Sequence, residues 1–193
     1  MRKVIYSLFL ALFIGCTTIK NVKKFTIPPV QQEMLDSISL EKEMKTYTLE
    51  IPKTWYSYKE VHGHIMHSPK VMQKRNTNFY ANNLYVTELS QKETKAKSIE
   101  VLFEYYHQKM KGFYPTIDFI PQKLNHKKYG KYYLIKYGNF FGNKNRPTTQ
   151  IDILFHYKNR NFELRYISEN KYYDEFIKDV ENIVKSFKIK EPN

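Results

Sequence analysis

The chain has 193 residues, of which 32 are Lys or Arg and 19 are Asp or Glu, so its formal net charge at pH 7 is +13. A basic chain of this kind can bind nucleic acid, but here the lysines are scattered, with neither a long run nor an RNA-binding aromatic motif. The composition is instead rich in Lys, Asn, Ile, Tyr and Phe together, as the codons of an AT-rich genome favour. We therefore expect no nucleic-acid partner.

The amino-terminal residues have the pattern of a bacterial lipoprotein leader. Arg2 and Lys3 form a positive head, and residues 4–14 carry no charge. This apolar run of about 11 residues fits a secretory signal peptide and is too short to span a bilayer. Residues 13–16, Phe-Ile-Gly-Cys, resemble the lipobox, in which the leader is cut before a cysteine that becomes acylated. We predict a signal peptide over 1–15 and lipidation of Cys16; an ordinary signal peptide with an incidental cysteine is the alternative.

Acylation would decide where the protein works. Each buried methylene contributes about 0.8 kcal/mol, so two or more acyl chains hold a protein durably at a membrane. Thr17, not Asp, follows Cys16, and the first acidic residue is Glu33. Neither an inner-membrane retention signal nor an acidic surface-export signal is therefore present. We expect a lipid-anchored protein of the cell envelope, in the outer membrane and facing the periplasm.

The mature chain divides into a tether and one domain. We predict a flexible tether over 16–43 and a single globular domain over 44–190, which is long enough to bury a sizeable core. Within the tether, Asp36-Ser37-Ile38 resembles the O-glycosylation signal of some Bacteroidetes-type bacteria, which modifies the residue after Asp. Ser37 is therefore a candidate glycosylation site, and an ordinary helix cap or turn is the alternative.

Seven segments have the alternation or the β-rich composition of strands. Pro121 suits a sheet edge, because proline cannot donate to a ladder. Lys158-Asn159-Arg160-Asn161 predicts a tight hairpin turn between the last two strands, since asparagine tolerates positive φ. The predicted strands are residues 45–52, 60–69, 82–89, 116–124, 131–141, 149–158 and 160–168.

Two segments have apolar residues at helical spacing. The first begins after Ser98, a good N-cap residue, and we expect Gly112 to close it. The second covers 171–189, with acidic residues near its amino end and lysines near its carboxyl end, as the helix dipole favours. A run of antiparallel strands with two amphipathic helices indicates an α+β layered domain.

The stretch of residues 47–58, with Pro52 ending a strand and Trp55 after it, resembles the opening of PsbP-like domains. The DcrB-type bacterial lipoproteins share that fold. Ser68-Pro69, the strand over 84–89 and the final helix ending in Ile-Val-Lys-Ser-Phe-Lys-Ile are also similar. The resemblance implies an α/β/α sandwich with a mainly antiparallel sheet flanked by helices. It implies a non-catalytic accessory or binding role at a membrane and carries over no catalytic residue.

Histidines give the sharpest chemical pattern. In an extended segment, His62 and His64 lie on one face and His67 on the other. Two imidazoles at this spacing can bind zinc or copper, with a third ligand such as His156 or Glu60. The alternative is a solvent-facing strand that happens to carry histidines.

A long loop over residues 138–149 gives a second candidate. Phe140 and Phe141 lie beside Lys144 and Arg146, which together predict an aromatic and basic contact patch for a protein partner or a lipid surface. The alternative is that one or both rings cover the core.

No segment has a nucleophile elbow or a phosphate-binding glycine loop, so we expect no enzyme and no cofactor. Three hypotheses remain. The first is a membrane-anchored envelope lipoprotein with a non-catalytic accessory or protein-binding role. The second is a small-ligand or metal-binding module that uses the His62 and His64 segment. The third is a hydrolase whose site forms only in three dimensions.

Overall fold

The computed structural model describes residues 33–60, 62–74, 82–117, 119–138 and 147–191. These residues belong to one structural unit, residues 31–193. The predicted leader, Cys16 and the patch of Phe140, Phe141, Lys144 and Arg146 lie outside the described residues. No helix of the described part is both long enough and apolar enough to cross a membrane.

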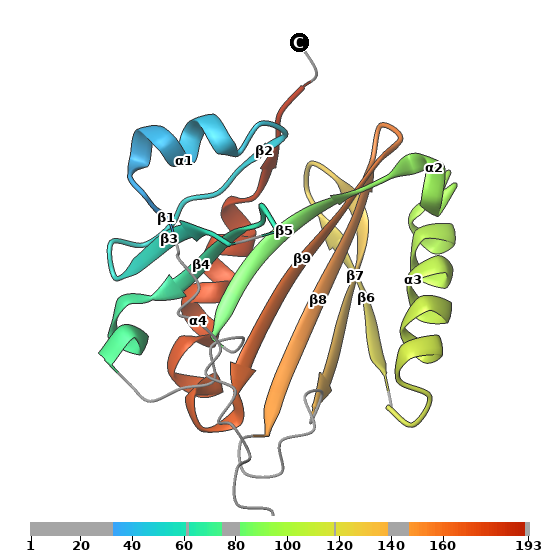
Figure 1. The fold of residues 1–193 in the computed structure, drawn as a ribbon. Helices are drawn as coiled ribbons and strands as arrows, with labels where there is room; N and C mark the ends of the chain where they lie inside the picture. Colours follow the sequence, from blue (N-terminus) through green and yellow to red (C-terminus); the bar gives the residue numbers. More distant parts are fainter. Residues whose placement is uncertain (1–32, 61, 75–81, 118, 139–146, 192–193) are drawn as a thin grey trace, which may run out of the picture. The chain divides into compact units, whose positions relative to one another are not determined.

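The centre of this unit is an eight-stranded sheet in which every neighbouring pair is antiparallel (Figure 1). In spatial order its strands are β1 (Glu33–Leu35), β3 (Trp55–Lys59), β4 (Ile65–Pro69), β5 (Asn83–Leu89), β9 (Arg160–Glu169), β8 (Thr148–Tyr157), β7 (Gly130–Gly138) and β6 (Ile120–His126). A small second sheet pairs β2 (Tyr47–Thr48) with β10 (Lys188–Ile189). The long strands β5, β9, β8 and β7 form the platform on which the site described below is built.

Two long helices cover the sheet. Helix α3 (Ile99–Phe113) packs over β7 and β8, and helix α4 (Asn170–Ser186) packs over β8 and β9 on the other face. The shorter helices are α1 (Ser37–Glu43), α2 (Gln91–Thr94) and the 3-10 turn η1 (Lys70–Lys74). The α+β sandwich, with a mainly antiparallel sheet flanked by helices, is therefore confirmed.

Each helix buries a separate core against its face of the sheet. On the α4 face, Phe176, Val180 and Ile183 pack with strand residues such as Phe155 and Leu164. On the α3 face, a smaller core contains Leu102, Tyr106 and Met110 of the helix with Ile135, Tyr137 and Leu154 of the strands. Full burial of a large apolar side chain contributes roughly 1.5–3 kcal/mol, so these two stripes hold the helices in place.

Local signals in the sequence locate several boundaries correctly. The Ser98 hydroxyl accepts a hydrogen bond from the Val101 amide at 3.3 Å and caps α3. Pro121 lies in β6, at the edge of the sheet. Lys158 and Asn159 form the hairpin turn between β8 and β9 with φ of 49° and 59°.

Other boundaries differ from the prediction. Gly112 does not close α3, which continues to Phe113. Helix α4 ends at Ser186, because the residues that follow pair with β2 instead of continuing the helix. Of the predicted strand over 45–52, only Tyr47 and Thr48 form a ladder.

Part of the predicted flexible tether over 16–43 is ordered structure. Strand β1 pairs with β3, with Met34 opposite Tyr58. The Asp36 carboxylate accepts the Ser39 amide at 2.7 Å and caps α1, whose first residue is the exposed Ser37. The Asp36-Ser37 pair is therefore a helix cap in this structure, and modification of Ser37 stays a prediction, as do the bounds of the leader.

Candidate functional site

A row of polar side chains crosses the α3 face of the sheet. Arg165 of β9 lies opposite Tyr85 of β5 on one side and opposite Asp152 of β8 on the other. Glu163 follows the same face of β9, two residues before Arg165, because side chains alternate along a strand. Antiparallel register therefore places two carboxyl groups, one guanidinium and one phenol side by side.

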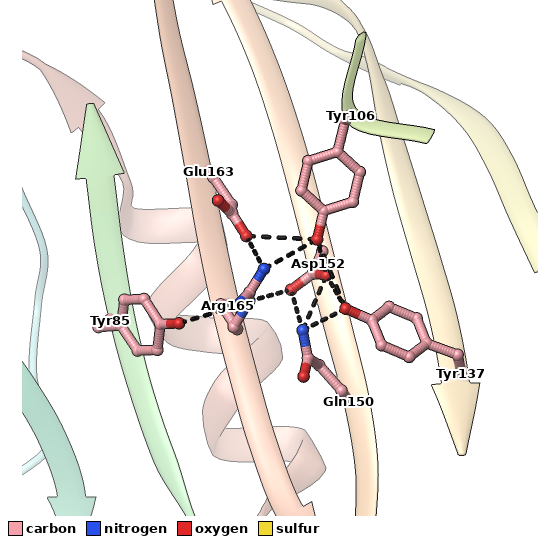
Figure 2. A network of polar contacts seen from close by, with 7 residues as sticks. All are labelled: Tyr85, Tyr106, Tyr137, Gln150, Asp152, Glu163 and Arg165. Atoms are coloured by element: carbon pink, nitrogen blue, oxygen red, sulfur yellow. Dashed lines mark hydrogen bonds and ion pairs between the residues drawn. The ribbon is translucent and has the colours of Figure 1, made fainter. Parts of the chain in front are cut away.

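Asp152 is the centre of this network (Figure 2). Its side chain is fully buried, and its Oδ1 atom accepts from the Arg165 Nε at 2.8 Å. The Gln150 amide donates to both carboxylate oxygens at 2.9 Å, and the hydroxyls of Tyr106 and Tyr137 also donate to Asp152. A buried carboxylate is tolerated only with such partners, since an uncompensated buried charge is costly.

Arg165 joins the network to the neighbouring strand and helix. Its Nη2 atom lies 2.5 Å from Glu163 Oε1 and donates to the Tyr106 hydroxyl at 2.9 Å. Its Nη1 atom donates to the Tyr85 hydroxyl at 3.1 Å, and its guanidinium lies 5.8 Å from the centroid of that ring. One guanidinium thus ties β5, β8, β9 and α3 together on this face.

The network shifts the pKa values of its members in a consistent direction. Burial raises the pKa of Glu163 to about 7; the Asp152 charge acts in the same direction, and Arg165 opposes both. Burial and the Asp152 charge also raise the pKa of Tyr106 and of Tyr137, so both phenols stay protonated as donors. Burial lowers the pKa of Arg165, but Asp152 and Glu163 outweigh it and hold that pKa well above its usual value.

A cleft of about 300 Å³ opens beside this network. Its walls come from α3 and the end of β5, and Glu163 and Arg165 of β9 form its polar side. The lining residues are Leu89, Tyr105, Tyr106, Lys109, Met110, Phe113, Tyr114, Glu163 and Arg165. A concave site with apolar walls and a few convergent polar groups is typical of small-ligand and side-chain binding sites.

This network was not predicted, because its carboxylates are dispersed in the sequence and match no motif. Asp152 is fully buried and Glu163 is 7% exposed, so neither lies on a solvated face. The available signal was the presence of Gln150, Asp152, Glu163 and Arg165 inside two strongly apolar strands that share a hairpin.

The predicted histidine site is arranged differently from the expectation. The segment over 60–69 is extended only from Ile65, and His62 and His64 are exposed residues of the turn between β3 and β4. Gly63 has a φ of 87°, and its amide donates to the Glu60 carbonyl at 2.8 Å, which closes this turn. The two imidazoles therefore do not lie on one face of a strand.

Of the two candidates for a third ligand, Glu60 lies in the same turn, where its Oε1 atom accepts from the His64 amide at 3.2 Å, and His156 lies elsewhere in the sheet. His156 lies on β8, which β5 and β9 separate from β4, and its Nδ1 atom is 2.7 Å from Asn161 Oδ1. Among the described residues, no group of three or more His, Cys, Asp or Glu side chains could hold a metal ion.

His67 lies in the core instead. It is fully buried, and its Nδ1 atom is 2.9 Å from the Ser57 hydroxyl across the β3–β4 pair. Burial lowers the pKa of His67 to about 3, so the imidazole is neutral. Both members of the pair are buried, with Ser57 5% exposed and His67 fully buried.

Comparison with known proteins shows the fold. No family model matches the sequence, and no curated protein matches it. Among solved structures, the chain is similar to the solution structure of cyanobacterial PsbP (CyanoP) from Synechocystis sp. PCC 6803. The TM-score is 0.50 at 11% sequence identity, and the match covers 86% of this chain and 96% of that chain. The fold is therefore PsbP-like, as the resemblance of residues 47–58 implied.

Proposed function

We propose that this chain is a lipid-anchored protein of the bacterial cell envelope, of the DcrB type, with a non-catalytic binding role. In this proposal the signal peptide over 1–15 is removed, and acyl chains on Cys16 hold the protein at the outer membrane, facing the periplasm. The leader pattern and the lipobox-like residues 13–16 support the anchor. The two acyl attachments expected for such a cysteine are enough for durable anchoring.

One observation carries the binding role: the polar groups beside the α3 cleft are bonded to one another. The Tyr106 and Tyr137 hydroxyls donate to Asp152, and Arg165 is shared between Asp152 and Glu163. A nucleophile or general base needs a partner that prepares it to act on a substrate. Here the same bonds hold the sheet to α3, and the cleft beside them has an exposed rim, which suits recognition.

The exposed rim of the cleft supports a protein as the bound partner. The Phe113 side chain is 66% exposed at the end of α3, next to Tyr114, with ring centroids 6.2 Å apart. Exposed aromatic side chains are enriched at protein interfaces, where they supply large contact areas.

Photocrosslinking in intact cells tests this role. A photoreactive phenylalanine derivative replaces Phe113 at the rim or, as the control, Val101, which is 45% exposed on the same helix and does not line the cleft. We expect a discrete crosslinked protein from position 113 and not from position 101. Equal labelling from both positions, or no adduct from position 113, would contradict a partner at this cleft.

A further inference from the structure

We propose that the α3 cleft binds an aliphatic primary ammonium group, with the Glu163 carboxylate as its anionic contact. This inference names the chemical group that the cleft recognises, and it rests on the binding role proposed above. The charge of the network, the second carboxylate oxygen of Glu163 and the walls of the cleft support it.

The charges of the network do not balance when Glu163 is ionised. Asp152 and Glu163 supply two negative charges, and Arg165 supplies one positive charge. Tyr85, Tyr106, Tyr137 and Gln150 complete the network as neutral groups (Figure 2). One negative charge therefore remains, and a cation that enters the cleft would compensate it.

The position of this excess charge is set by the hydrogen bonds of Glu163. The bonds that Glu163 makes with the described residues end on its Oε1 atom, which contacts Arg165 and the Tyr106 hydroxyl. Figure 2 shows the other carboxylate oxygen without a dashed line to any residue drawn. Arg165, by contrast, uses Nε, Nη1 and Nη2 within the network. Glu163 is therefore the group at the cleft that can accept a further hydrogen bond.

The walls of the cleft suit an apolar stem that ends in a cation. Leu89 and Met110 supply aliphatic surface, while Tyr105, Phe113 and Tyr114 supply aromatic rings. An ammonium group near aromatic faces gains cation–π attraction in addition to its ion pair. The volume of about 300 Å³ admits a short alkylammonium, such as the end of a lysine side chain.

The raised pKa of Glu163 agrees with this reading. Burial and the Asp152 charge raise the pKa to about 7, so the ionised form lacks full compensation without a ligand. The charged or titratable groups that contact Glu163 are Arg165 and Tyr106, with Asp152 close behind them. A bound cation favours the ionised form, so binding should weaken as the pH falls below the pKa.

Among the described residues that line the cleft, Lys109 and Arg165 are the cations; Arg165 is paired within the network, so Lys109 opposes a cationic ligand. Its side chain is exposed, and its ammonium lies 5.8 Å from the centroid of the Tyr105 ring. Its charge should weaken the binding of an ammonium and strengthen the binding of an anion. Replacement of Lys109 therefore tests whether the ligand is a cation or an anion.

The experiment uses the full-length protein in maltoside micelles, labelled with 13C at the methionine methyl groups. Met110 lines the cleft and reports occupancy, and Met72 in the opposite core serves as the internal control. n-Butylammonium is titrated, with 1-butanol as the neutral probe of equal shape. We expect a saturable shift of the Met110 signal and about tenfold weaker binding of 1-butanol, since a charge-assisted hydrogen bond is lost.

Two variants should change the affinity in opposite directions. Glu163→Gln should weaken n-butylammonium about tenfold, and Lys109→Met should strengthen it about twofold. The matched controls on exposed positions of α3, Glu104→Gln and Lys111→Met, should leave the affinity within about twofold of wild type. Because one variant weakens and the other strengthens, a general loss of folding cannot produce the pattern.

Several results would overturn the inference. The first is the absence of a shift of the Met110 methyl signal, and the second is equal affinity for 1-butanol and n-butylammonium. The others are an unchanged affinity of Glu163→Gln for n-butylammonium and a weaker affinity of Lys109→Met for it. On the wild-type protein alone, a lack of weakening between pH 8 and pH 5 would also overturn it.

A second titration distinguishes the source of the ammonium. Acetyl-Gly-Gly-Lys-Gly-Gly-amide carries the group on a protein-like chain. Binding of both probes supports a lysine of a protein partner, and binding of n-butylammonium alone supports a free amine. The crosslinking experiment is independent, because a partner can be captured at position 113 even if neither probe binds, and either probe can bind without such a partner.

Discussion

Replacement of Asp152 by Asn tests the network most sharply. The substitution keeps the size of the side chain but removes the charge that receives Arg165 Nε at 2.8 Å in a fully buried position. The Asn amide has only one acceptor atom, so it cannot accept from the Tyr106 and Tyr137 hydroxyls on one side and from Arg165 Nε on the other. Glu163 stays as the counter-ion of Arg165, so part of the compensation remains.

The expected loss of stability follows from these contacts. Breaking a buried ion pair by removing one partner costs about 3–5 kcal/mol, and the remaining Glu163 places Asp152→Asn near the lower end, at about 3 kcal/mol. In a chain of this length, 1 kcal/mol corresponds to roughly 2–4 °C in Tm, so a decrease of about 6–12 °C is expected.

Urea unfolding followed by tryptophan fluorescence measures the change. The matched control is Asp174→Asn, an exposed position on α4, which should cost about 0.5 kcal/mol or less. A loss under about 1 kcal/mol for Asp152→Asn, with an unchanged m value, would show that the network does not hold this face together.

Three further predictions concern pH and capping. The pKa of Glu163 is about 7 in the folded protein and 4.5 ordinarily, so its protonated form favours folding. In urea titrations, the stability difference between wild type and Glu163→Gln should be largest in favour of wild type below pH 4.5. It should decrease as the pH rises through 7. For His67 the pH dependence is reversed, because burial lowers its pKa from 6.5 to about 3. Its contribution to the free energy of unfolding should be present above pH 6.5 and be lost on acidification. In His67→Gln, the free energy of unfolding should therefore change less between pH 6.5 and pH 4 than in wild type. Ser98→Ala should lower the free energy of unfolding by about 1 kcal/mol, because the cap on the Val101 amide is lost, whereas Ser98→Asp should retain it; equal loss in both variants would contradict the cap.

Local chemistry made much of the fold predictable. Ser98, Pro121 and Asn159 each act through the backbone of their own segment, so a cap, an edge strand and a turn could be read without knowledge of the neighbours. The strand predicted over 82–89 is β5, in which Leu84 and Val86 belong to the core on the α4 face and Tyr85 lies opposite Arg165.

The polar network around Asp152 was harder to predict, because it depends on contacts between segments that are distant in the sequence. The Asp152–Arg165 pair follows from the hairpin, because a turn at Lys158 and Asn159 places these residues opposite each other. The addition of Tyr106 could not be read in this way, since it depends on how α3 lies over β8.

The histidine segment shows the reverse case. An extended strand was predicted through His62 and His64, but Gly63 permits a positive φ and the chain turns there. The spacing of the two histidines predicts a strand, but Gly63 between them has the backbone freedom that the turn requires.

In the function proposed above, lipids on Cys16 hold the PsbP-like domain at a membrane. Intact-mass measurement of the protein isolated from its native membranes tests this anchor. We expect a chain that begins at Cys16 and carries the added mass of a diacylglyceryl group and an amide-linked acyl chain. A chain that retains residues 1–15, or an unmodified thiol at Cys16, would contradict it.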